Sequence, residues 1–198
     1  MRSVKFENKL ITPCKIVCIG RNFVEHIYEL GNEVPSDPVY FIKPNSAIAD
    51  KIFYQEGLHY EAEITFLIQN KRIVAAGVGL DLTLRNVQSR LKAKGLPWER
   101  AKAFRGSAVL SPFVAIDSWK DLSIEAYRNG DLVQKGSVDL MIYKPDFLVE
   151  DMDRIFGLDD EDVIMSGTPK GVGEIAPGDR FTLKLLRKEK LLLTFSVQ

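Results

Sequence analysis

The sequence predicts a mostly β protein with short helices, an α+β fold whose mixed sheet is rolled or sandwiched. Three observations favour this class: strand-like runs dominate the chain, Asn129-Gly130 joins two of them, and the strands do not alternate with long helices as in a doubly wound sheet. A length of 198 residues with 45% apolar residues allows one sizeable core. We therefore expect residues 1–198 to form one domain.

The expected strands follow one another along most of the chain. They cover residues 15–19, 39–43, 60–68, 72–79, 113–116, 122–128 and 162–165, with two more at the C-terminus. Asn129-Gly130 follows the sixth of these runs, and a two-residue turn that needs positive φ at both positions favours this pair. The sequence therefore predicts a β-hairpin there.

Three short helices are expected between the strands. The first has Asn22 as a candidate N-cap, Glu25 at the third helical position and Gly31 just after its end. Its buried stripe should consist of Phe23, Ile27 and Leu30. The second is expected over residues 83–94, and the third from Pro145 to about Gly157.

Composition excludes several classes of partner. Lys plus Arg and Asp plus Glu each number 27, so the formal net charge is 0 and no global field favours nucleic acid. Glu7 interrupts any signal-peptide core, and no run approaches 18 apolar residues, so we expect no membrane association and a cytoplasmic location. Cys14 and Cys18 would lie about 13 Å apart on a strand, so both are expected to be free thiols.

The most informative segment is an acidic strand. A period of two places His59, Glu61 and Glu63 on one face, with the two glutamate Cα atoms about 6.6 Å apart. Such a pair is common on a solvent-facing strand, so spacing alone leaves that ordinary interpretation open. Asp81 ends the next strand-like run, and three oxygen donors without a thiolate would suit Mg²⁺ or Mn²⁺, with Ca²⁺ as a further option.

Two other groups of residues could carry chemistry. His26 and Glu29 are three apart on the first helix, which makes them either an ordinary surface pair or a general base with its orienting carboxylate. Residues 166–173 read Ser-Gly-Thr-Pro-Lys-Gly-Val-Gly, which is either a structural turn or a loop whose amide and hydroxyl groups receive a carboxylate. The loop lacks the Gly-Lys-Ser/Thr ending of a nucleotide-binding P-loop.

Six segments together resemble one known family. In chain order they read CIGRNFVEHIYELGNEVP, VYFIKP, HYEAEITFLI, GLDLTLRNVQ, KGLPWERAKAF and VIMSGTPKGVG. Their order and spacing are similar to those of the fumarylacetoacetate hydrolase family, from about residue 14 to the end. The similarity is greatest to the short, single-domain members that act on acylpyruvates or oxaloacetate.

The resemblance implies a mixed β-roll, usually a homodimer, that binds Mg²⁺ or Mn²⁺ and a small 2-oxo acid. It implies that Glu61, Glu63 and Asp81 hold the metal. It also implies that His26 and Glu29 activate a water, within a segment that orders as a lid over the substrate.

Further residues are implied to contact the substrate. The family pattern matches Lys102 and Gln88 as contacts of substrate oxygens, and Arg21 and Thr168, beside Gly167, as contacts of its carboxylate. Two positions depart from the pattern, Asn86 where the family commonly has Asp, and Arg105 after Ala103-Phe104. Because both are expected near the substrate, they put specificity in doubt and leave the metal ligands unchanged.

The leading functional hypothesis is hydrolysis of the C–C bond of an acylpyruvate such as fumarylpyruvate. The alternative is an isomerase, tautomerase or decarboxylase of dicarboxylic 2-oxo acids such as oxaloacetate or 2-hydroxyhepta-2,4-diene-1,7-dioate, because one chelated 2-oxo acid supports each of these reactions. A non-catalytic protein that binds a metal and an organic acid is a rival from another class. A thiol enzyme using Cys18 is disfavoured, since nothing nearby in the sequence lowers the pKa of that thiol.

Overall fold

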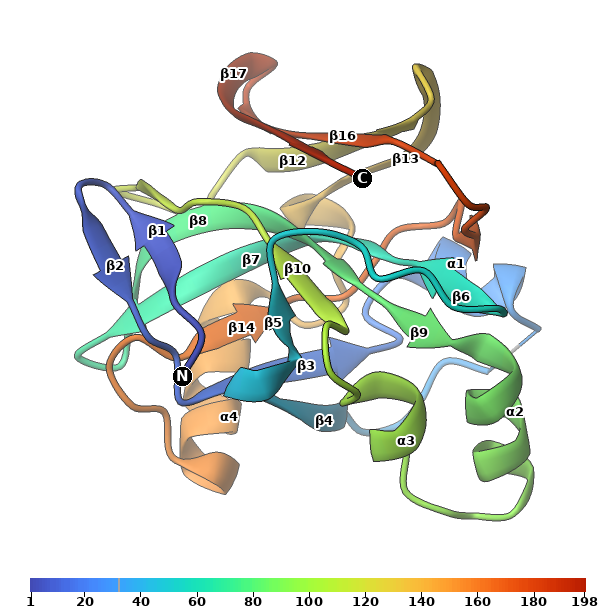
Figure 1. Cartoon of the computed structure of the whole chain (residues 1–198). Helices are drawn as coiled ribbons and strands as arrows, with labels where there is room; N and C mark the ends of the chain where they lie inside the picture. Colours follow the sequence, from blue (N-terminus) through green and yellow to red (C-terminus); the bar gives the residue numbers. More distant parts are fainter. Residues whose placement is uncertain (32) are drawn as a thin grey trace.

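The structure is a computed structural model that describes residues 1–31 and 33–198. Its larger sheet has the strand order β4-β3-β14-β7-β8-β10-β5, and a further strand, β11, pairs with β8 (Figure 1). In that order the strands are β4 (Val39–Pro44), β3 (Lys15–Gly20), β14 (Val163–Met165), β7 (Ala62–Gln69), β8 (Arg72–Asp81), β10 (Ala108–Leu110), β5 (Ile48–Ala49) and β11 (Val114–Ala115). The pairs β14/β3 and β10/β5 are parallel and the others antiparallel, so the predicted mixed sheet is confirmed.

A second, antiparallel sheet lies against the first, at the top of Figure 1. Its order is β13 (Asp131–Ser137), β12 (Leu122–Arg128), β16 (Phe181–Arg187) and β17 (Lys190–Val197). Three short strands form a small sheet, β15 (Gly173–Glu174), β6 (Leu58–Tyr60) and β9 (Thr83–Leu84), and the chain begins with the hairpin β1 (Val4–Phe6) and β2 (Lys9–Ile11). The predicted hairpin is confirmed between β12 and β13, with φ of 54° at Asn129 and 98° at Gly130.

The described residues form four α-helices, where the sequence predicted three. They are α1 (Val24–Glu29), α2 (Arg85–Ala93), α3 (Glu99–Lys102) and α4 (Pro145–Phe156), and two 3₁₀ turns cover Asn45–Ala47 and Val138–Leu140. The third expected helix is confirmed as α4. Helix α3 was not predicted, because four residues are too few to show a helical period.

Three details of the expected helices were wrong. Helix α1 begins one residue later than predicted, because the Asn22 side chain is used elsewhere: it donates to the carbonyls of Tyr143 and Ser166 and accepts from Tyr143 N–H. Leu30 is 38% exposed and does not belong to the buried stripe, whereas Phe23 and Ile27 do. Helix α2 begins at Arg85 because the two residues before it pair with β6 as strand β9.

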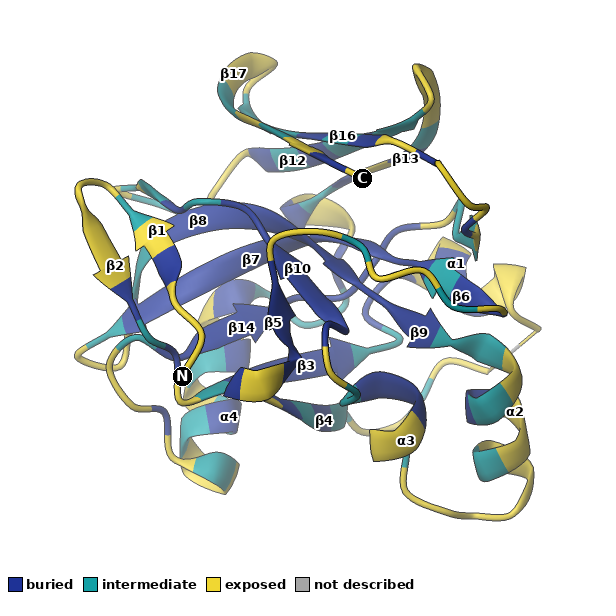
Figure 2. Ribbon diagram, viewed as in Figure 1, coloured by how far each residue is buried: buried dark blue, intermediate teal, exposed yellow. Residues whose placement is uncertain are grey.

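Strand β7 lies at the centre of the larger sheet and is buried on both faces (Figure 2). Ile64 and Phe66 pack in one hydrophobic cluster with residues of the second sheet such as Ile124. The alternate residue Leu67 packs in the other cluster, with residues of β3 and β14. Fully burying each such side chain contributes about 1.5–3 kcal/mol, so Ile64 and Phe66 help to hold the second sheet against the larger one.

Among the described residues, no helix combines the length and the apolar character that crossing a membrane requires. Cys14 and Cys18 are both free thiols, as predicted.

Candidate active site

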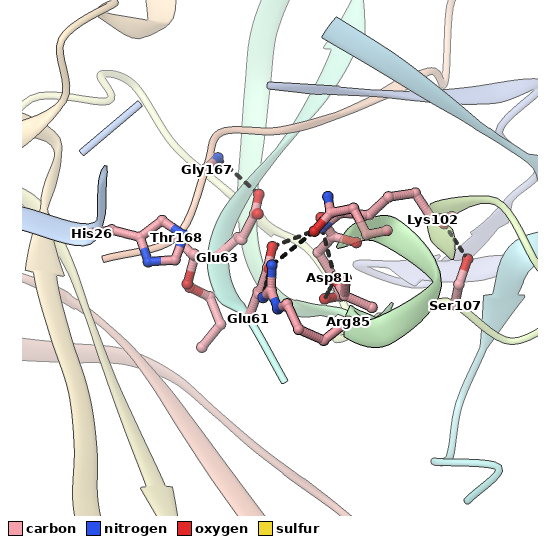
Figure 3. A network of polar contacts seen from close by, with 12 residues as sticks. His26, Glu61, Glu63, Asp81, Arg85, Lys102, Ser107, Gly167 and Thr168 are labelled. Carbon is pink, nitrogen blue, oxygen red and sulfur yellow. Dashed lines mark hydrogen bonds and ion pairs between the residues drawn. The ribbon is translucent and has the colours of Figure 1, made fainter. Parts of the chain in front are cut away.

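Three buried carboxylates meet where β7 and β8 pair. Glu63 lies on β7, Glu61 directly precedes that strand, and Asp81 is the last residue of β8 (Figure 3). The backbone N–H of Asp81 donates to the carbonyl of Glu61 at 2.8 Å, which places these two residues side by side. One carboxylate oxygen from each of the three residues lies within 4.8 Å of the others. We call Glu61, Glu63 and Asp81 the acidic cluster.

The acidic cluster is enclosed and does not face solvent. Glu61 is 5% exposed, and Glu63 and Asp81 are each 1% exposed. The ordinary interpretation of a solvent-facing acidic strand is therefore wrong. It failed because a strand packed on both faces still alternates in sequence, while its polar residues point into the protein.

Three cationic side chains contact the acidic cluster. Lys102 Nζ lies 2.7 Å from Oε2 of Glu61 and 2.6 Å from Oδ2 of Asp81. Arg85 forms an ion pair with Glu61, and Nζ of the fully buried Lys43 lies 2.8 Å from Oδ1 of Asp81. Lys102 was expected to contact substrate, and the structure places its ammonium group among the acidic side chains. Glu61 and Asp81 and their three cationic partners are tolerated in this buried setting because each has an opposite charge within hydrogen-bonding distance.

Lys43 and Arg85 were missed as functional residues. Both lie inside segments that carried the family resemblance, VYFIKP and GLDLTLRNVQ. A lysine inside an otherwise apolar strand was the available signal for Lys43, because an unpaired ammonium group would not be buried there.

The acidic side chains differ in their proton affinities. Burial, reinforced by the charges of Asp81 and Glu61, raises the pKa of Glu63 well above its ordinary range. Burial opposes ionisation of Glu61 too, but Lys102 and Arg85 outweigh it and hold the pKa of Glu61 below its ordinary range. Burial alone would lower the pKa of Lys102, and Asp81 and Glu61 raise it instead. The acidic cluster therefore has one carboxyl group, Glu63, whose negative charge is poorly balanced by the protein.

The donors of the acidic cluster fit a hard divalent cation. All three are carboxylates and no thiolate contributes, which suits Mg²⁺ or Mn²⁺ better than zinc. Oδ1 of Asp81 lies 2.8 Å from Nζ of Lys43 and has no other polar partner among the described residues, and a carboxylate oxygen carries a second lone pair that could meet a cation. A bound cation would supply the charge that lets Glu63 ionise, so the residues present fit such a group.

His26 and Glu29 form a pair beside the acidic cluster. His26 is 5% exposed, and its Nδ1 lies 3.1 Å from Oε2 of Glu29. The other oxygen of Glu29 accepts the backbone N–H of Gly171 at 2.9 Å. Because His26 is buried and its partner is held at both oxygens, the pair is more than an ordinary surface contact between neighbouring helical residues. Asn32, in the segment expected to act as a lid, lies outside the described residues.

The loop after β14 also contacts the acidic strand. The backbone N–H of Gly167 donates to Oε2 of Glu63 at 2.8 Å, and the hydroxyl of Thr168 donates to the carbonyl of Ala62 at 2.9 Å. The loop therefore positions the acidic strand directly. Gly167 was expected to help bind a substrate carboxylate, and the structure uses its N–H for the carboxylate of Glu63.

A small cavity of about 40 Å³ opens onto the site. Among the residues predicted to bind substrate or act in catalysis, it is lined by Arg21, His26, Gln88, Lys102 and Thr168, together with Glu61 and Glu63. Arg85 and Lys92 add two cationic groups to this lining. The structure thus brings most of the predicted site residues around one space, with basic groups facing acidic ones.

Asn86, which was expected near substrate, lies outside the cavity. Its side chain does not line the cavity but a separate depression beside Gly57 and Glu174. The helix explains the difference: Arg85 and Gln88, three apart, share the inner face of α2, and the position directly after Arg85 points away. Arg105 does not line the cavity either.

Two other chemically suggestive residues do not join the site. His59 is half-buried in β6, where burial and the nearby Arg85 lower its pKa, and it does not line the cavity. Burial raises the pKa of the Cys18 thiol well above its ordinary value, and Asp81 raises it further. A thiolate nucleophile at Cys18 therefore gains no support.

Comparison with known proteins gives consistent matches. Oxaloacetate tautomerase YcgM of Escherichia coli is 38% identical over 190 residues, which is 85% of this chain and 87% of that protein. The mitochondrial oxaloacetate decarboxylase of Dictyostelium discoideum is 34% identical over 188 residues, covering 84% of this chain and 86% of that one. A crystal structure of fumarylpyruvate hydrolase from Pseudomonas aeruginosa in complex with Mn²⁺ and pyruvate superposes with a TM-score of 0.89 at 26% identity, covering 100% of this chain and 94% of that one.

The family match covers nearly the whole chain. The domain described as Fumarylacetoacetate (FAA) hydrolase C-terminal matches residues 15–193. This range contains the larger sheet, the second sheet except for the end of β17, the acidic cluster and the His26/Glu29 pair. The resemblance recognised in the sequence is thereby confirmed, and the chain is an enzyme of the fumarylacetoacetate hydrolase family.

Proposed function

We propose that this protein is a divalent-cation-dependent enzyme that interconverts the keto and enol forms of oxaloacetate. The observation that carries the proposal is the enclosed acidic cluster surrounded by cationic side chains in one cavity. Relatives named as oxaloacetate tautomerase or decarboxylase, at 34–38% identity, favour this substrate over an acylpyruvate. The alternative weighed in the sequence analysis thus has better support than its leading hypothesis.

The charges of the site suit a doubly charged substrate. Lys43, Lys102 and Arg85 balance the acidic cluster when its three carboxylates are ionised. A divalent cation then adds an excess of positive charge in a low-dielectric site, which favours an anionic substrate such as a dicarboxylate. Arg21 and Lys92 add positive charge around the cavity, where the second carboxylate of such a substrate would lie.

In the proposed reaction, a proton leaves C3 of oxaloacetate and a proton from solvent is added to the oxygen on C2, so that the substrate loses and gains one proton. A Mg²⁺ or Mn²⁺ ion held by the acidic cluster would polarise the 2-oxo acid. His26 accepts the C3 proton, Glu29 orients the imidazole through Nδ1, and Lys102 donates a hydrogen bond to the oxygen on C2 as negative charge develops there. Gln88, Arg21 and Thr168 orient the substrate from the cavity wall.

A second candidate function is hydrolysis of an acylpyruvate. The His26/Glu29 pair supports it, because an imidazole held by a carboxylate can also deprotonate water. The similar fold of fumarylpyruvate hydrolase also supports it, although that protein is less identical to this chain than the oxaloacetate enzymes are.

The test is a direct assay of both reactions. Purified protein is mixed with oxaloacetate, and decay of the enol absorbance is followed with Mg²⁺, with Mn²⁺ and after EDTA treatment. Release of pyruvate from fumarylpyruvate is followed in parallel. We expect cation-dependent enol decay that EDTA abolishes and Glu63→Gln nearly abolishes, whereas Glu174→Gln, which changes an exposed acid outside the cavity, should retain it. Full activity of Glu63→Gln in EDTA, or faster turnover of fumarylpyruvate, would reject the proposal.

We further propose a homodimer in the cytoplasm, the assembly and location expected from the sequence. Large apolar side chains such as Tyr28, Leu140 and Phe147 are exposed on the described surface, and a second copy would cover part of such a surface. Light scattering coupled to size-exclusion chromatography measures the assembly. A monomer at micromolar concentration would contradict it.

A further inference from the structure

Gln134 is a buried polar residue outside the cavity. It lies on β13, the edge strand of the second sheet, and only 2% of its surface is exposed. Its side chain is fully used in hydrogen bonding. Oε1 accepts the backbone N–H of Ala62 at 2.9 Å, and Nε2 donates to Oγ1 of Thr168 at 2.8 Å and to the carbonyl of Pro169 at 2.7 Å. A buried amide satisfied at both ends holds its partners in one geometry.

The partners of Gln134 are two backbone groups and one hydroxyl next to the acidic cluster. Ala62 stands between Glu61 and Glu63 in the chain, so its N–H belongs to the peptide that joins it to Glu61. Thr168 follows Gly167, whose N–H donates to Glu63, and Thr168 itself donates to the carbonyl of Ala62. Gln134 therefore closes a ring of hydrogen bonds that includes the acidic strand and the loop after β14.

The same loop continues to the His26/Glu29 pair. Two residues after Pro169, the backbone N–H of Gly171 donates to Glu29. Strand β13 also packs against this part of the loop. A Cβ atom on Gly171 would lie 2.0 Å from the carbonyl oxygen of Val133, and one on Gly136 would lie 2.8 Å from Cβ of Pro169. The backbone of β13 and the loop thus approach as closely as glycine permits on both sides of Gln134.

We propose that Gln134 is a positioning residue for the metal-binding carboxylates, acting from the second sheet without touching metal or substrate. It sets the backbone of Ala62 and of the loop at Thr168 and Pro169, and through them the side chains of Glu61 and Glu63. The inference rests on the proposed function in one respect only, that the acidic cluster binds a divalent cation. Partners that orient metal ligands contribute about 10- to 100-fold in metal affinity.

The test measures Mn²⁺ affinity by titration calorimetry or by the EPR signal of free Mn²⁺, without substrate. Gln134→Met keeps the size of the side chain and removes all three hydrogen bonds. We expect its Kd for Mn²⁺ to rise by about 10-fold or more. Gln134→Glu keeps an acceptor for Ala62 N–H and loses both donors, so its Kd should also rise above the wild-type value, though less than that of Gln134→Met. This second variant carries the test if Gln134→Met does not fold.

A matched control separates positioning from general stability. Leu183→Ala opens the fully buried core of the same second sheet on β16, away from the loop. It should lower the melting temperature at least as much as Gln134→Met, yet leave the Kd for Mn²⁺ within about twofold of wild type.

The possible results have distinct meanings. A folded Gln134→Met with the wild-type Kd, or a Kd that rises equally in Leu183→Ala, overturns the role of Gln134 and leaves the proposed function intact. Failure of the wild-type protein to bind Mn²⁺ overturns both the cation requirement and this inference. A rise in Kd confined to the Gln134 variants supports it.

Discussion

The ammonium nitrogen of Lys102 lies 2.6 Å from Oδ2 of Asp81, at the centre of the candidate active site. Lys102 also contacts Glu61 and the hydroxyl of Thr83, so its side chain links the acidic strand to the end of β8. A cation bound by the acidic cluster would share these oxygens with Lys102. The lysine therefore competes electrostatically with the metal and stands where it can reach a substrate coordinated beside it.

This relationship predicts opposite effects of Lys102→Met on binding and turnover. Removing a positive charge next to Asp81 and Glu61 should tighten Mn²⁺ binding by about 3- to 10-fold. Turnover of oxaloacetate should fall by about 100-fold, because the hydrogen bond to the oxygen on C2 is lost. Calorimetry and the enol assay measure the two effects separately. Weaker Mn²⁺ binding together with normal turnover would show that Lys102 is only structural.

Replacing His26 should separate the reactions that one bound substrate can undergo. In His26→Gln, keto–enol exchange should fall by about 100-fold because the base that accepts the C3 proton is absent. Decarboxylation of oxaloacetate needs no such base, since the cation stabilises the enolate formed when CO₂ leaves, and any activity of this kind should persist. Enol absorbance and CO₂ release distinguish the outcomes, and equal loss of both would contradict the assigned role.

The close approach at Gly171 predicts a large effect of a single methyl group. Gly171 has φ of 101°, and in Gly171→Ala the added Cβ would lie 2.0 Å from the carbonyl oxygen of Val133. Gly130→Ala is the matched control, because Gly130 has φ of 98° but no atom within 4 Å of the added Cβ. The control should cost about 1–2 kcal/mol of unfolding free energy from backbone strain alone. Gly171→Ala should cost more.

Only the substitution at Gly171 should affect catalysis as well, because the Gly171 N–H holds Glu29. Denaturant unfolding and the enol assay compare the two variants. Equal stability losses, or normal turnover in a folded Gly171→Ala protein, would show that the loop adapts to the extra atom.

Asp179, which lies two residues before β16, should make the stability of the fold sensitive to acid. Burial favours its neutral form, but the backbone N–H of Ala176 and the side chains of Arg128 and Asn129 outweigh burial and lower its pKa. A carboxyl group whose pKa is lower in the folded state stabilises the fold at neutral pH, and this stabilisation is lost as pH falls from the unfolded pKa, about 4, through the lower folded pKa.

Asp179→Asn should therefore lower the unfolding free energy by about 1–3 kcal/mol at pH 7 and by less as the pH approaches 3. Chemical denaturation across this range measures the difference. Asp50→Asn, which changes an exposed acid, serves as the control. A constant difference between wild type and Asp179→Asn at every pH would contradict the assigned cause.

Strand alternation and turn chemistry predicted much of the site, because both depend only on residues close together in the sequence. The alternation around Glu61 and Glu63 placed both on one face, and the Asn129-Gly130 turn required a hairpin. The start of α1 was misplaced for the opposite reason. Asn22 has the chemistry of an N-cap, but Tyr143 and Ser166, more than 100 residues away, use its side chain instead.

By itself, the sequence determined the β-rich class, the hairpin, the acidic residues and the family, because alternation, turn chemistry and ordered motifs are properties of the chain. Three features were decided only by the tertiary structure. The acidic strand is buried on both faces, Lys43 and Arg85 form ion pairs with two acids of the cluster, and Gln134 hydrogen-bonds this strand from the second sheet. These contacts depend on which segments, distant in sequence, pack together. A buried charge or amide requires a partner, but its local sequence does not say which residue supplies it.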